Sequence, residues 1–138
     1  MLRPGGRLAL AVWGGLPRNP FFAALGTTLV QAGHLPPPDP SAPGPFSLAG
    51  PDRVRGLLEA AGFADVRAEE VAVRFVLRDV DEYVAISADT SGPMALVLQG
   101  LEEAERAHVT ESLGAALAPF RSGARYEVPG LAVVAVAA

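Results

Sequence analysis

The residues that could carry acid, base or metal chemistry are few and scattered along this chain. There is no cysteine, so thiolate nucleophiles, thiolate metal ligands and disulfides are all excluded. The two histidines, His34 and His108, show no metal-ligand spacing, so we assign no metal site. We interpret His108 as a helix-surface residue and His34 as a solvated residue at the mouth of a loop, the alternative for His34 being a base beside a substrate.

The carboxylates favour helix caps over catalysis. Asp79 and Glu82 are three residues apart, the spacing of a capping box, and we prefer that interpretation to an acid–base pair. Glu102, Glu103 and Glu105 suit the solvated first turn of a helix, where negative charge is favourable. No catalytic residue is assigned on these grounds.

Composition narrows the class of protein. The chain has 138 residues, half of them apolar, 19% charged and a net charge of −4. A single domain is expected at this length, and the lack of a basic balance argues against nucleic acid as a partner. The apolar runs at 8–13 and 131–138 are far shorter than the roughly 20 residues of a membrane-spanning helix. We therefore expect a cytoplasmic protein with no membrane partner.

The first 50 residues predict a strand, a helix and a loop. Arg7–Trp13 is a continuous apolar run, which is typical of a strand covered on both faces. Asn19 is predicted to cap the next helix, with Pro20 at its first position and Gly33 as its stop. The segment 34–50 is rich in proline and is expected to be an extended surface loop.

A helix and a second strand follow. The segment 51–63 predicts a helix that Gly62 ends, and Phe63 is expected to pack back onto Leu58. Alternating residues predict a strand at about 65–77, and Arg74 indicates that one of its faces is wetter. The apolar stripe expected along the helix consists of Val54, Leu57, Leu58 and Ala61.

The remaining elements are a helical stretch and a last strand. Residues 79–120 predict several helices, the longest at 101–120, with Leu101, Ala104, Val109, Leu113 and Leu117 at helical spacing. Residues 121–125 are expected to turn the chain. The run 131–137 then predicts a central strand covered on both sides, with Pro129–Gly130 marking a bulge or a late start.

Two motifs carry a resemblance to a known family. LRPGG at 2–6 stands before an apolar strand, and LLEAAGF at 57–63 precedes DVRAEEVAV. The chain resembles the C-terminal half of a class I S-adenosylmethionine-dependent methyltransferase, of the small-molecule type in ubiquinone and menaquinone biosynthesis. The resemblance implies an α/β, partial Rossmann-like sheet of three strands in the family order 5-7-6, the last strand antiparallel, with four or five helices.

The same resemblance implies a divided enzyme. The family's glycine-rich loop and ribose-binding acidic residue have no counterpart here, so S-adenosylmethionine is expected for the full-length enzyme and not on this chain. Residues 79–120 are expected to cover a small-molecule acceptor within one domain, 1–138. The substrate-pocket candidates are Trp13, Phe21, Phe22, Tyr83 and Met94, with core packing as the alternative.

A missing neighbour would leave the first strand as a bare edge. Such an apolar edge favours self-association, so we expect a homodimer that pairs through Leu8, Ala9, Leu10, Ala11 and Val12. Three hypotheses stay open: a methyltransferase fragment that is inactive alone, a stand-alone dimeric binding module, and a degenerate product without a selected function.

Overall fold

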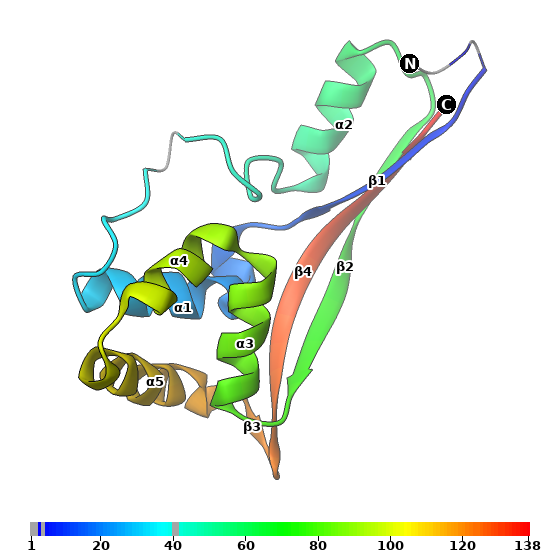
Figure 1. The fold of residues 1–138 in the computed structure, drawn as a ribbon. Coiled ribbons are helices and arrows are strands. Elements are labelled where there is room, and N and C mark those ends of the chain that lie inside the picture. The colour runs from blue at the N-terminus through cyan, green and yellow to red at the C-terminus, as the bar shows by residue number, and fades with distance from the viewer. Residues whose placement is uncertain (1–2, 4, 40–41) are drawn as a thin grey trace. The chain divides into compact units, whose positions relative to one another are not determined.

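The computed structural model describes residues 3, 5–39 and 42–138, which form an α/β fold (Figure 1). Within these residues there are five α-helices and four strands, and two short 3-10 turns at Leu16–Arg18 and Ala118–Phe120. The elements are β1 (Leu8–Trp13), α1 (Pro20–Gln31), α2 (Pro51–Ala60), β2 (Val66–Leu77), α3 (Val80–Thr90), α4 (Gly92–Gly100), α5 (Glu103–Leu117), β3 (Arg121–Ser122) and β4 (Arg125–Ala137).

The chain divides into two compact units. Unit 1 comprises Met1–Asn19, Ser41–Val73 and Gly130–Ala138, and unit 2 comprises Pro20–Pro40 and Arg74–Pro129. Unit 1 therefore contains β1, α2, the first part of β2 as far as Val73, and the last part of β4 from Gly130 onward. Unit 2 contains the other four helices, β3 and the remainder of β2 and β4.

The sheet of unit 1 has the predicted strand order. β4 lies between β1 and β2, and it runs antiparallel to β1, with Leu8 opposite Ala137 and Trp13 opposite Ala132. At the start of β2, the Ala138 N–H donates to the Asp65 carbonyl at 3.3 Å. The C-terminal strand is thus central, as expected, and β1 lies at a sheet edge.

One face of this sheet is covered and the other is partly open. Val54 and Leu58 of α2 pack with Val133 and its β4 neighbours, and Leu8, Leu10 and Val12 join this cluster. On the opposite face Ala9 and Ala11 are exposed, and Val136 is 47% exposed. The prediction that β1 and β4 are covered on both faces is therefore wrong. Exposing alanine costs little free energy because its apolar area is small. A run of apolar residues that contains alanines therefore looks the same whether the alanines are buried or exposed.

Helix α2 ends as the sequence predicts. Gly62 has φ of 92°, a left-handed conformation that favours glycine. The Phe63 N–H donates to the Leu58 carbonyl at 3.2 Å, and Phe63 packs against the cluster that contains Leu58. The predicted stripe is too wide, however, because Leu57 is 51% exposed and Ala61 is exposed as well.

Unit 2 is a helical unit with its own core. Val109, Leu113 and Leu117 of α5 are buried at the predicted spacing, whereas Ala104 is exposed and Leu101 lies before the helix begins. The buried core consists of Phe21, Leu25, Leu29, Leu77, Tyr83, Leu98, Leu101, Val109, Leu113, Leu117, Tyr126 and Val128.

Carboxylates cap two helices of unit 2. The Asp79 side chain accepts from the Glu82 N–H at 2.8 Å, which confirms the cap. The Glu82 carboxylate accepts from the backbone and side chain of Arg78, so the box closes one residue earlier than predicted. Glu102 and Glu105 form a second, reciprocal capping box at the start of α5, and both are exposed as expected.

A hairpin leads into β4. The short strand β3, beyond the three expected, pairs with the start of β4, and Gly123 between them has φ of 60°. β4 begins at Arg125, so Pro129–Gly130 does not mark a late start. Arg74 is exposed, and its guanidinium donates to Glu127 at 3.1 Å, in keeping with the wetter face predicted for β2.

Two sequence features fall partly outside the described residues. Of the LRPGG motif, residues 2 and 4 are not described, but the Gly6 N–H donates to the Arg3 carbonyl at 2.9 Å and Gly5 has φ of 75°. These two observations agree with a turn before β1. Of the proline-rich segment 34–50, residues 40 and 41 are not described, and the remainder contains no helix or strand.

Candidate functional site

Four of the five substrate-pocket candidates lie in unit 2, around one aromatic cluster. The Phe21 ring stacks on Phe75 with centroids 4.2 Å apart, and the Phe22 and Tyr83 rings meet this pair edge-on. Phe21 is 3% exposed and Tyr83 is fully buried, and Met94 packs against the same core. Because so much aromatic surface is already in contact, the cluster primarily holds the unit together.

The Tyr83 hydroxyl is inserted into the first turn of α1. It accepts from the Leu25 N–H at 2.9 Å and donates to the Phe21 carbonyl at 2.8 Å. These two backbone groups are four residues apart and would pair directly in an uninterrupted helix. Burial raises the pKa of Tyr83, and the bonds from Leu25 and from Ser87 oppose this shift. The phenol therefore stays neutral and pins α3 to α1.

Trp13, the fifth candidate, belongs to unit 1. It is the last residue of β1, lies opposite Ala132 of β4 and is half-buried. The aromatic cluster belongs to unit 2, and a role of Trp13 in a substrate pocket stays a prediction.

Asn19 has a structural role that sequence reasoning missed. It is fully buried, and its amide nitrogen donates to the carbonyls of Gly14, Gly15 and Leu131 at 3.1 to 3.2 Å. Its amide oxygen accepts from the Leu131 N–H at 2.9 Å. Asn19 therefore ties the end of β1 to β4, where a helix cap was predicted. The dipeptide Asn19–Pro20 looks the same in the sequence whether Asn19 caps the helix or bonds to β4.

The two edges of the unit 1 sheet differ in charge. β2 contains Arg67, Glu69 and Glu70 on its unit 1 portion, whereas no residue of β1 is charged. Charged side chains discourage the addition of another strand to a sheet edge. β1 is thus the edge suited to a further strand, and Leu8, Ala9, Leu10, Ala11 and Val12 stay the candidates for an association surface.

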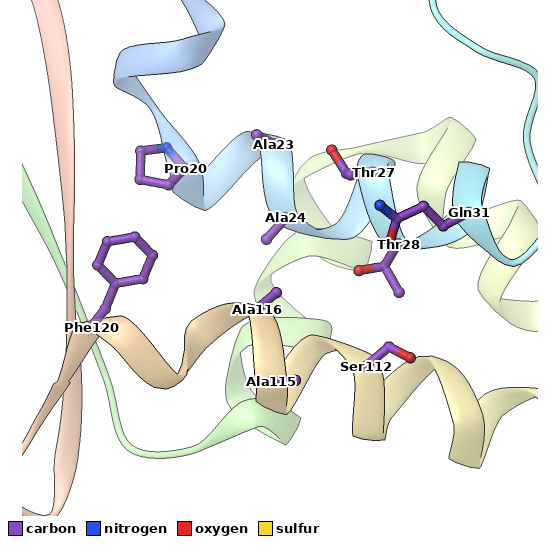
Figure 2. Close-up of a pocket in the computed structure, with 10 residues that line it drawn as sticks. All are labelled: Pro20, Ala23, Ala24, Thr27, Thr28, Gln31, Ser112, Ala115, Ala116 and Phe120. Carbon is purple, nitrogen blue, oxygen red and sulfur yellow. The ribbon is translucent and has the colours of Figure 1, made fainter.

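A groove lies between α1 and α5 of unit 2 (Figure 2). Its volume is about 580 Å³, and none of its lining side chains is charged. The lining residues are Pro20, Ala23, Ala24, Thr27, Thr28, Gln31, Ser112, Ala115, Ala116 and Phe120. None of the five predicted pocket residues is among them. The only indication of this groove in the sequence is the set of small side chains on the two helices, and small residues are common in helices without a groove.

The two histidines do not form a site together with other ligands. His34 directly follows the glycine that ends α1, and His108 is exposed on α5. In residues 3, 5–39 and 42–138 there is no group of three or more His, Asp or Glu side chains placed to hold a metal ion. Across the same residues, no helix is both long and apolar enough to cross a bilayer.

The chain matches no known family model and no curated protein sequence.

Proposed function

We propose that this chain is the acceptor side of an S-adenosylmethionine-dependent methyltransferase that acts on a small molecule. The observation that carries the proposal is the strand order: the C-terminal strand β4 lies between β1 and β2 and is antiparallel to β1. That arrangement is what the resemblance implies for the last three strands of the family. The A-G-F helix end at Gly62 and the turn at Gly5 support the same assignment.

The position of the helical unit supports an acceptor-side role. α3, α4 and α5 are inserted between β2 and β4 in the chain, where the family resemblance implies a substrate cover. Methyl transfer demands alignment of donor and acceptor more than it demands an acid–base pair. A site without an assigned catalytic residue is consistent with that chemistry.

Gly14, at the end of β1, does not offer the open backbone of a donor site. The Gly14 N–H already donates to the Leu131 carbonyl at 2.8 Å, and a Cβ at Gly14 would lie 2.9 Å from the Leu131 side chain. Gly14 therefore allows the close approach of Leu131 within unit 1, and its backbone is not open to the adenosine group of the donor. The donor would have to be bound by residues outside this sequence.

The coding DNA next to this sequence tests the proposal. We expect an in-frame region, or a partner polypeptide encoded beside it, with an acidic residue followed by a Gly-x-Gly-x-Gly stretch. Coexpression of that region with this chain should produce a complex that binds S-adenosylmethionine. The absence of such a region, or a complex that does not bind the donor, would contradict the proposal.

The second candidate is a stand-alone dimeric binding module, and the uncharged edge at β1 favours it. Two copies would pair β1 with β1 across a two-fold axis and extend the sheet. Light scattering tests this candidate, which requires a concentration-independent dimer of this chain alone. A monomer at high concentration contradicts it.

A further inference from the structure

We propose that the groove between α1 and α5 is a binding site for an uncharged amphiphilic small molecule, with an apolar ring at one end and a hydroxyl or carbonyl group at the other. The proposal does not depend on the function proposed above. It concerns a groove of unit 2 alone, and it would hold equally for an enzyme or a binding module.

The key observation is the hydroxyl of Thr28. Thr28 is 5% exposed, and its side chain extends from α1 toward α5 in the groove (Figure 2). Within the described part of the chain, no hydrogen bond is made by this hydroxyl, and no side-chain oxygen that lacks a partner is sealed from the surface. The Thr28 oxygen is therefore reachable from the groove and has a free donor and acceptor.

Another helical threonine, Thr90, shows that a threonine hydroxyl in a helix need not lack a hydrogen bond. The Thr90 hydroxyl in α3 donates to the Ile86 carbonyl one turn earlier, at 2.7 Å. That internal bond is the usual way for a helical threonine to satisfy its hydroxyl. Thr28 makes no such internal bond, so its hydroxyl is left to water or to a ligand in the groove. A ligand hydroxyl or carbonyl could replace that water and bond to Thr28 while its apolar part covers the groove.

The lining specifies the chemistry of the ligand. Pro20 and Phe120 lie at one end of the groove, and Gln31 and Ser112 lie toward the other, on the side of Thr28 (Figure 2). The first end offers apolar and aromatic surface, and the second offers hydroxyl and amide groups. No lining side chain carries a charge that would compensate an ionic ligand. The volume of about 580 Å³ falls in the range of about 300 to 1,000 Å³ common for small-molecule sites.

The proposal is tested with three probes on the full chain: 2-naphthol, naphthalene and the anion 2-naphthoate. Amide NMR spectra should show that 2-naphthol shifts the signals of Thr28, Ser112 and Ala116, with naphthalene weaker and 2-naphthoate weakest. Equal binding of naphthalene and 2-naphthol, tighter binding of the anion, or shifts confined to other residues would each overturn the proposal. So would concentration-dependent broadening of these signals without any probe, since it would indicate that a second copy occupies the groove.

Two variant pairs locate the interaction. Thr28→Val keeps the side-chain shape and should weaken 2-naphthol binding about five- to tenfold, the usual loss for one hydrogen bond. Thr90→Val is its matched control and should leave binding unchanged. Ala116→Leu fills the groove and should abolish binding, whereas Ala107→Leu on an exposed part of α5 should not. Circular dichroism spectra confirm that each variant is folded, and equal affinity of Thr28→Val and Thr90→Val would refute the site.

Discussion

Each unit of this protein buries a polar side chain with several hydrogen bonds, but the two side chains connect very different things. Asn19 of unit 1 joins the end of β1 to Leu131 of β4, 112 residues away in the chain. Tyr83 of unit 2 bridges two groups within a single turn of α1. Asn19 therefore links two distant parts of the unit 1 sheet, whereas Tyr83 adds hydrogen bonds between two helices that already share an apolar core.

The units also differ in what they leave open. Unit 2 closes its core around twelve buried apolar residues. Unit 1 covers one sheet face with α2 and leaves Ala9, Ala11 and Val136 exposed on the other, next to an edge strand that carries no charge. Unit 1 thus has the features of a sheet that another strand continues. Unit 2 also exposes apolar side chains, but Leu96 (72%) and Ile86 (36%) lie on helices and not beside an uncharged strand edge. This contrast supports the acceptor-side proposal.

Removing the Asn19 side chain should have the largest effect on stability. Asn19→Ala leaves buried groups of Gly14 and Leu131 without partners, and we expect a loss of about 3 kcal/mol in the free energy of unfolding. Urea denaturation measures this loss. The exposed Thr27→Ala variant should cost less than about 0.5 kcal/mol. A loss near zero for Asn19→Ala would show that unit 1 does not depend on this residue.

A methyl group at Gly14 should have the next largest effect. Its Cβ would lie 3.0 Å from the Leu131 carbonyl oxygen, which cannot move aside as a side chain can. We expect Gly14→Ala to cost about 2 kcal/mol in unfolding experiments. Gly15→Ala is the matched control, because its Cβ would meet Pro17 at an ordinary 3.7 Å. Equal stability of the two variants would contradict the close approach.

Tyr83→Phe should cost less than either change in unit 1. The ring stays in the aromatic cluster, and the Leu25 N–H and Phe21 carbonyl can pair directly once the hydroxyl is gone. We expect a loss of about 1 kcal/mol, measured by urea denaturation. A loss larger than that of Asn19→Ala would reverse the comparison between the units.

The buried phenol also predicts a dependence on pH. The pKa of Tyr83 is higher in the folded protein than its usual value near 10, so the unfolded chain releases this proton first. The contribution to stability is complete below about pH 10 and is lost as the pH rises above that value toward the folded pKa. Unfolding curves from pH 9 upward should fall more steeply for the native protein than for Tyr83→Phe. Parallel curves would contradict this assignment.

Charge on the β1 edge should have no large effect on folding but should alter association. Ala9→Lys with Ala11→Lys places two charges on exposed positions of β1 and should abolish self-association of the chain, measured by light scattering. Ala72→Lys, at an exposed position of β2, is the control. An unchanged dimer in the first variant would exclude β1 as the contact.

The order of elements and the central position of β4 follow from local signals. Gly62, the alternation along 66–77 and the apolar run at 131–137 each act over a few residues, and the structure confirms them. Asn19 was misassigned because Asn–Pro before an apolar helix is the same pattern whether the side chain caps that helix or bonds to Leu131. Only the fold brings Leu131 within reach.

Surface features were the least predictable. The exposure of Ala9 and Ala11 cannot be distinguished from burial by hydropathy, since alanine is common in both settings. The groove depends on how α1 and α5 pack, and its small residues are ordinary in helices. The pocket candidates are apolar residues near the parts that the resemblance implies cover an acceptor, and the same apolar character places Phe21 and Tyr83 in the core.

The most direct test of the acceptor-side account is calorimetric titration of S-adenosylmethionine into this chain alone and into its complex with the encoded glycine-rich region. The account predicts no binding to the chain alone and binding to the complex, with loss of the complex in the Ala9→Lys, Ala11→Lys variant. Micromolar binding by the chain alone would contradict the account, as would a complex that forms unchanged when the β1 edge is charged.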